Sequence, residues 1–266
     1  MAKKKNDNGI KKDQPVWRRT TKVLKRIFKQ PKIISLSGEL PKKAIYVANH
    51  AAMFGPVMYN LYMPVSIAPW GAYPMTEGYK SRYNYLRNVY FIQKRHKSKF
   101  AATILASFEA ALSIYFYRGL RVIPSYNDNR FIKTIRRSID MLDNDISVMI
   151  FPEDSDEGYH EVLTDFHAGF VELAKYYGKK KGEDIPIYPV YYHAKKRVIV
   201  IGEPSRLTEY TDRGMNRQEI ATNFCHQVNE LFFNHIQDKP KQLPEQAPEQ
   251  LLEQPEQTTE QETEQK

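Results

Sequence analysis

Cysteine is almost missing from this chain, which has one, Cys225, among 266 residues. A single cysteine excludes a disulfide scaffold and a cysteine-rich zinc module, and it fits a reducing compartment. The sequence also contains no P-loop, no G-x-G-x-x-G turn after a predicted strand and no G-x-S-x-G elbow, which argues against the common nucleotide-binding and serine-hydrolase classes. The histidines show no metal-ligand spacing, so we expect no metal site.

Uninterrupted apolar runs are short. Residues 51–75 are apolar and aromatic, but four prolines divide them. The most apolar run, Phe100–Tyr117, carries Glu109 at its centre, which favours a buried or interface-lying helix over a membrane span. The mean hydropathy of -0.61 likewise argues against a polytopic membrane protein.

Acidic residues are scarce at the N-terminus, where residues 1–43 hold 14 Lys and Arg against three Asp and Glu. The formal charge of the whole chain is +9, and residues 239–266 reverse the sign with seven Glu against three Lys. Basicity is therefore a property of the N-terminal arm rather than of the fold. Such an arm binds phosphate on nucleic acid or on anionic lipid. We favour a membrane phospholipid surface and expect no nucleic acid, because an amphipathic helix follows the arm.

The N-terminal segment is predicted to be a disordered basic arm over residues 1–14 and an amphipathic, membrane-facing helical segment over residues 15–40. Pro15 suits a first helical turn, and Pro31 ends the helix. The apolar stripe consists of Val16, Trp17, Val23, Leu24, Ile27 and Phe28, and the cations opposite or beside it are Arg18, Arg19, Lys22, Lys25, Arg26 and Lys29. A Trp-containing stripe with a cationic face is typical of a helix in a membrane interface. The alternative is a helix that packs its stripe on the domain core.

Strands alternate with helices from residue 41 to residue 238, which predicts an α/β domain whose mostly parallel central sheet is flanked by helices. The predicted strands are Ala44–Ala48, Arg121–Pro124, Ile146–Phe151, Ile185–Tyr192 and Arg197–Ile201. One predicted helix starts at Met53 or Phe54. The other predicted helices cover Phe100–Tyr117, Phe131–Leu142, Phe166–Tyr177 and about Asn216–Ile236. Residues 239–266 repeat Pro-Glu-Gln units and are predicted to be a disordered acidic tail.

Polar side chains follow two of the predicted strands. Asn49 and His50 follow the first, and Phe151–Gly158, with four acids in five positions, ends the third. Ligands of open α/β sheets bind at the carboxyl ends of the strands. A lone histidine there is usually an ordinary loop residue, so its neighbours decide whether it is functional.

Four short blocks extend this pattern. Residues 49–56 read NHAAMFGP, residues 119–125 read GLRVIPS, residues 151–155 read FPEDS and residues 188–190 read YPV. In order and spacing they resemble the blocks of the glycerolipid acyltransferase superfamily, among them N-H-x-x-x-x-D-P, F-P-E-G-T/S and V-P-V. Residues 166–170 (FHAGF) also resemble the F-K-x-G-A start of a family helix. The resemblance covers about Ala44–Pro204, and the order of the blocks carries it, because each block alone is weak.

The resemblance implies transfer of an acyl group from acyl-CoA or an acyl carrier protein to the hydroxyl of a lysophospholipid-type acceptor, at the cytoplasmic face of a membrane. His50 would be the general base that takes the proton of the hydroxyl. Substrate binding would fall to Glu153, Asp154, Ser155, Arg121 and Arg130. The two arginines flank the second block and are candidates for the acceptor's phosphate, surface solvation being their alternative role. No bound cofactor is implied, because the thioester donor is a co-substrate.

The chain departs from the family pattern at the partner of the histidine. Gly55 stands at the position of the motif's aspartate, whose role is to hold the imidazole in its working tautomer. Three explanations follow. Another carboxylate substitutes for it, the candidates being Glu153, Asp154, Asp156 and Asp128. Alternatively His50 works unassisted, or the chain is a degenerate member that binds lipid or acts as a scaffold without chemistry.

Overall fold

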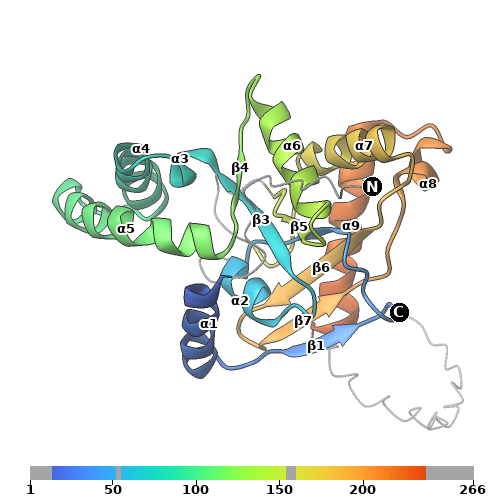
Figure 1. Ribbon diagram of the computed structural model, residues 1–266. Coiled ribbons are helices and arrows are strands. Elements are labelled where there is room, and N and C mark those ends of the chain that lie inside the picture. The colour runs from blue at the N-terminus through green and yellow to red at the C-terminus, as the bar shows by residue number, and fades with distance from the viewer. Residues whose placement is uncertain (1–13, 52–54, 154–159, 238–266) are drawn as a thin grey trace, which may run out of the picture. The chain divides into compact units, whose positions relative to one another are not determined.

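The computed structural model describes residues 14–51, 55–153 and 160–237. The centre of this part of the chain is a seven-stranded sheet with helices on both faces (Figure 1). The predicted basic arm, apart from Gln14, and the predicted Pro-Glu-Gln tail lie outside the described residues.

The sheet has the strand order β1-β7-β6-β2-β5-β3-β4. Its strands are β1 (Lys32–Ser35), β2 (Ile45–Ala48), β3 (Ile67–Ala72), β4 (Ile123–Ser125), β5 (Ser147–Ile150), β6 (Ile187–His193) and β7 (Val198–Ile201). All neighbours pair in parallel except β6 and β7, which pair antiparallel. The prediction of an α/β fold with a mostly parallel sheet flanked by helices is confirmed.

The helices that cover the sheet are α2 (Gly55–Tyr62), α6 (Phe131–Leu142), α7 (Gly169–Lys181), α8 (Leu207–Thr211) and α9 (Arg217–His235). The bounds of α6 are those predicted from its apolar stripe. Asn216 caps α9, since its side chain accepts hydrogen bonds from the backbone N–H groups of Gln218 and Glu219. Cys225 lies on the buried face of the same helix.

Strand β2 shows how the sheet divides the core. All four of its residues are buried, as expected of a parallel strand that is covered on both faces. Ile45 and Val47 belong to a hydrophobic cluster shared with α6, α7 and α9, whereas Tyr46 and Ala48 belong to a second cluster shared with α2. The residues that follow β2 are therefore anchored by packing on two sides.

Two strands were not predicted. β1 lies inside the predicted helical segment 15–40 and pairs with the last strand, β7. β3 lies inside the proline-divided stretch and contains Pro69. The proline is tolerated because β3 pairs with β5 over residues 67–69 and with β4 over residues 70–72, so each half of the strand has one partner.

A helical excursion connects β3 to β4. It consists of α3 (Tyr73–Thr76), α4 (Tyr79–Asn84), the π-helix η2 (Tyr85–Lys94) and α5 (Lys99–Gly119), and Figure 1 shows α4 and α5 side by side. The excursion has a small core of its own, formed by Met75, Leu86, Phe91, Ala102, Ala106 and Ala110. The three alanines, spaced four residues apart, let the backbone of α5 approach its neighbours closely.

The first helix, α1 (Pro15–Ile27), divides its apolar stripe between core and solvent. Trp17 is buried and packs on Gly119, at the end of α5. Leu24 and Phe28 pack against the cluster that contains α2, whereas Val16, Val23 and Ile27 are 61%, 54% and 66% exposed. Core packing thus accounts for half of the stripe, and a membrane-facing role for the other half stays a prediction.

Candidate active site

The register of the strands brings His50 and Glu153 together. Val47 of β2 pairs with Ile150 of β5. His50 and Glu153 each lie three residues beyond this pair, so they leave adjacent parallel strands at the same level of the carboxyl edge. The two side chains that the sequence placed after separate strands are neighbours in the fold.

Glu153 holds the backbone of His50. Its Oε1 accepts a hydrogen bond from the His50 backbone N–H at 2.5 Å. Burial raises the pKa of Glu153 to about 7, although this hydrogen bond lowers it. Glu153 is itself fixed by an antiparallel bridge to Phe166, so the contact joins three segments of the chain.

Aromatic side chains line one side of the imidazole. His50 is half-buried, and its ring meets that of Phe151 edge to face, with the centroids 5.1 Å apart and an interplanar angle of 68°. The ring of Phe151 lies 5.8 Å from that of Tyr59 in α2. These contacts restrict the rotation of the imidazole and cover one of its sides with apolar surface.

Asn49, the residue before His50, ties three elements together. Its buried amide donates to the carbonyl of Tyr192 at 3.0 Å and accepts from the N–H of Tyr192 at 2.8 Å. The hydroxyl of Tyr59 donates to the same Asn49 oxygen at 2.8 Å. Every partner is buried, so these bonds fix the end of β2 relative to β6 and α2. The sequence signal for Asn49 was its place in the N-H block, but its two partners, Tyr192 and Tyr59, could not be found from spacing.

Gly55 has no room for a side chain. A Cβ added there would lie 1.9 Å from the carbonyl oxygen of His50. The adjacent Ala51 adopts a left-handed backbone, with φ of 47°, which non-glycine residues rarely do. An aspartate at position 55 would therefore clash with the backbone of the histidine it was meant to support.

Arg130 and Asp128 lie at the same sheet edge but engage one another. The carboxylate of Asp128 accepts from Nε and Nη2 of Arg130 at 3.0 and 2.7 Å, which lowers the pKa of Asp128 to about 2. The guanidinium carbon lies 4.5 Å from the ring centroids of both Tyr73 and Tyr126. Glu77 adds a second carboxylate at 3.7 Å. Asp128 is thus committed to Arg130, in a loop that follows β4, three strands away from β2.

Arg121 lies at the other end of β4. Ile123, two residues after Arg121, pairs in parallel with Trp70 near the middle of β3. Arg121 therefore lies before the amino end of β4, whereas His50 lies beyond the carboxyl ends of the parallel strands. Its backbone is left-handed, with φ of 57°, and burial lowers the pKa of its guanidinium. The structure does not bring Arg121 to His50.

Three predicted site residues, Asp154, Ser155 and Asp156, lie outside the described residues. Within the described ranges, no group of three or more His, Cys, Asp or Glu side chains is placed to hold a metal ion.

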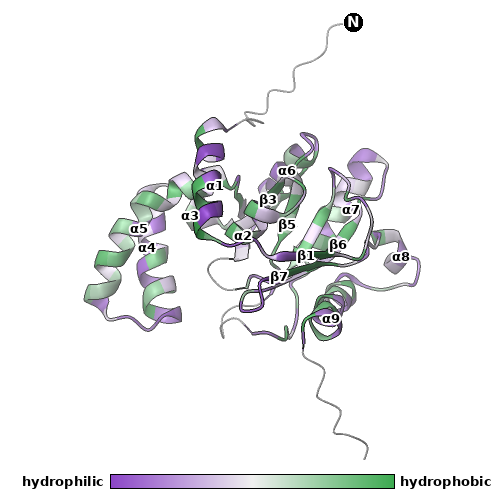
Figure 2. Ribbon diagram, turned by 90° about the horizontal axis from the view of Figure 1, so that it is seen from below, coloured by the Kyte–Doolittle hydropathy of each residue, from purple (hydrophilic) through white to green (hydrophobic). Residues whose placement is uncertain are grey.

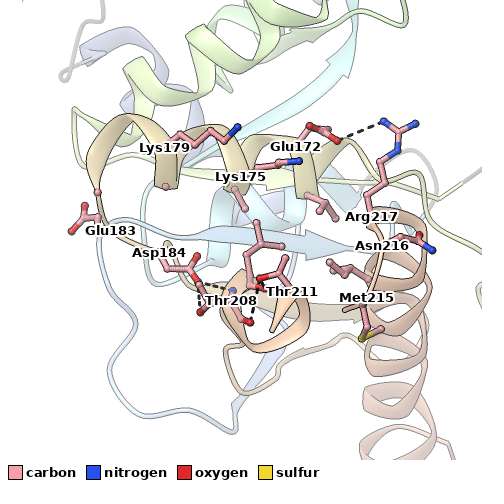
Figure 3. Close-up of a pocket in the computed structure, with 16 residues that line it drawn as sticks. Glu172, Lys175, Lys179, Glu183, Asp184, Thr208, Thr211, Met215, Asn216 and Arg217 are labelled. Atoms are coloured by element: carbon pink, nitrogen blue, oxygen red, sulfur yellow. Dashed lines mark hydrogen bonds and ion pairs between the residues drawn. The ribbon is translucent and has the colours of Figure 1, made fainter. Parts of the chain in front are cut away.

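A pocket of about 560 Å³ lies away from the predicted site, between α7, α8 and the start of α9 (Figure 3). Lys175 and Lys179 of α7 and Thr208 of α8 line it, and Arg217 pairs with Glu172 across one end at 3.6 Å. None of the predicted site residues lines this pocket.

The chain thus has a mostly parallel α/β fold with a histidine and a carboxylate at the carboxyl edge of its sheet. No protein-family model matches it, and no curated protein matches it. Among solved structures, the 1-acyl-sn-glycerophosphate (LPA) acyltransferase PlsC from Thermotoga maritima aligns with 87% of this chain and 86% of its own, at 14% identity and a TM-score of 0.46. A likeness at this level carries no functional argument, so the proposal below rests on the residues and their geometry.

Proposed function

We propose that this protein is an O-acyltransferase that moves a fatty acyl group from a thioester donor, acyl-CoA or an acyl carrier protein, to the hydroxyl of a lysophospholipid-type acceptor. The observation that carries the proposal is the His50–Glu153 pair at the carboxyl edge of the sheet. The order of the four sequence blocks supports the same reaction. The proposed location is the cytoplasmic face of the membrane, where such an acceptor resides.

In the proposed reaction, a ring nitrogen of His50 takes the proton of the acceptor hydroxyl as its oxygen attacks the thioester carbonyl carbon. The tetrahedral intermediate then expels the thiolate, which takes the proton from the imidazolium. A C–O bond forms, a C–S bond breaks, and the imidazole is regenerated. The products are the ester and the free thiol, so the cycle needs no metal or redox partner.

Glu153 is proposed to be a positioning residue. Its carboxylate bonds the backbone N–H of His50, and Phe151 packs against the ring. Backbone anchoring and ring packing would together supply the orientation that the family's aspartate provides through a hydrogen bond. Of the two arginines, we assign the acceptor's phosphate to Arg130, since it lies at the His50 edge whereas Arg121 does not.

The test compares acyl transfer by the wild type and by His50→Ala, with several lysophospholipid acceptors and a long-chain acyl-CoA. Loss of a general base should lower the rate about 100-fold or more. His235→Ala, at the end of α9, is the matched control and should retain activity. Equal rates for wild type and His50→Ala would contradict the proposed base.

A second candidate function is lipid binding without chemistry on the same fold. The observation that favours it is Gly55, where the local backbone excludes the side chain that the family uses to orient its base. Wild-type protein that binds lysophospholipid vesicles but transfers no acyl group to any acceptor would support this second function.

A further inference from the structure

The outer face of α5 is apolar along almost its whole length. Its exposed apolar side chains, which we call the α5 outer face, are Phe100, Ile104, Leu105, Phe108, Leu112 and Tyr115. Each of them lies three or four residues from another, which places them on one side of the helix. Phe100 and Phe108 are 77% and 71% exposed. Fifteen residues separate the first from the last, a stripe about 22 Å long. A face that exposes this much apolar surface is typical of an interaction surface.

Helix α1 extends the α5 outer face at the C-terminal end of α5. The hydroxyls of Thr20 and Tyr115 are in hydrogen-bond contact, and the ring of Trp17 lies 5.9 Å from that of Tyr115. The exposed edge of α1, formed by Val16, Val23 and Ile27, therefore adjoins the helix end that carries Tyr115. Figure 2 shows hydrophobic residues along α5 and interspersed with hydrophilic ones on α1.

Lysine and arginine outnumber acids around this surface, although α5 itself carries Glu109. Residues 78–108 hold seven Lys and Arg and no Asp or Glu, and residues 14–38 hold another seven without an acid. Exposed cations mark both ends of the apolar surface, with Arg95, Lys97 and Lys99 at the η2–α5 turn and Arg19 and Lys22 on α1. A second copy of this chain would bring like charges together, whereas an anionic bilayer complements them.

The inward side of α5 holds it in the fold. Arg82 of α4 donates from Nε to the carbonyl of Ala110, and Arg87 of η2 donates to the hydroxyl of Thr103. By length and composition α5 is long and apolar enough to cross a membrane, and 22% of its apolar window is buried. If α5 crossed alone it would lose these two arginine contacts, and if it took its partners along it would carry both guanidinium groups into hydrocarbon. The geometry therefore fits a helix that lies in the interface plane.

We infer that the α5 outer face and the exposed edge of α1 form a docking surface for an anionic phospholipid bilayer, with α5 lying parallel to the membrane. The apolar side chains enter the boundary between headgroups and acyl chains, and the cations at both ends contact lipid phosphates. The inference stands apart from the proposed chemistry, because bilayer binding is measured without turnover.

The test is sedimentation of the full chain with vesicles of equal parts phosphatidylglycerol and phosphatidylcholine. Phe100→Gln/Phe108→Gln removes the two most exposed rings of α5 and keeps good helix formers, so binding should fall about tenfold or more while the circular dichroism spectrum stays unchanged. Phe233→Gln, at a 43% exposed position of α9, is the control and should bind like wild type. Wild-type binding should weaken with added salt and with vesicles of phosphatidylcholine alone.

Three outcomes would overturn the inference. The double variant could bind the vesicles as tightly as wild type. Analytical ultracentrifugation could show a wild-type dimer that the double variant loses without a change in vesicle binding, which would assign the face to a second copy of the chain. Preference for duplex DNA over the anionic vesicles at equal salt would assign the cations to nucleic acid.

Discussion

At the scale of single residues, the pKa of Glu153 makes stability depend on pH. Burial raises that pKa from 4.5 to about 7 in the native state, so between these values the native protein binds more protons than the unfolded chain. The free energy of unfolding should therefore fall as the pH rises through this window, by up to about 3 kcal/mol from this group. Glu153→Gln cannot ionise, and its unfolding free energy should lose this dependence.

Urea unfolding at about pH 5 and about pH 8 measures this difference. Glu203→Gln, at an exposed position, is the control and should keep the wild-type slope. Identical pH dependence in wild type and Glu153→Gln would show that the carboxyl titrates at an ordinary value.

Gly55 provides a second prediction at this scale. Gly55→Asp would place an aspartate where the motif that residues 49–56 resemble carries one, but its Cβ would lie 1.9 Å from the His50 carbonyl oxygen. The backbone must move, so we expect a loss of about 1–3 kcal/mol in the free energy of unfolding and no gain in acyl transfer. Thermal unfolding checks the first and a thioester assay the second. Gly38→Asp, where a Cβ meets no atom within 4 Å, is the matched control. A stable Gly55→Asp variant with faster turnover would contradict this account.

At the scale of elements, the contact between α1 and α5 depends on Gly119. The indole of Trp17 lies so close to Gly119 that an added Cβ would be 2.2 Å from it. Gly119→Ala should displace Trp17, shift the tryptophan emission and destabilise the protein by about 1–3 kcal/mol. Trypsin should then cut α1 sooner, at its exposed arginines and lysines.

Gly178→Ala in α7 is the control for this prediction. A Cβ there meets its first neighbour at 3.7 Å, an ordinary contact, and alanine favours the helix. The control should be neutral or slightly stabilising. Unchanged emission and proteolysis in Gly119→Ala would show that α1 does not depend on this contact.

At the scale of the whole molecule, local patterns predicted the elements whose residues are buried on a regular period. The stripe of α6 and the apolar run of β5 were both located within a residue or two. β1 and β3 were missed for a physical reason. Each strand is defined by its pairing partners in the sheet. The four residues of β1, next to a basic helix, and the six residues of β3, around Pro69, show no hydrophobic alternation of their own.

The candidate site was predictable only in part. Placing His50 and Glu153 after neighbouring parallel strands followed from the sheet rule, and the structure brings them together. The ion pair between Asp128 and Arg130 depends on which side chains meet in the fold. The position of Arg121 at the opposite end of β4 depends on strand register. Neither can be read from spacing along the chain.

The docking of Trp17 has a consequence for synthesis. Helix α1 is translated before the residues on which its indole rests, since Tyr115, Phe116 and Gly119 are added about a hundred residues later. At ribosomal rates this is a delay of roughly 5–20 s. During that time the residues on which the indole rests are missing from the nascent chain. A chaperone or a lipid surface that reaches α1 in this interval meets it before its partners in α5 exist.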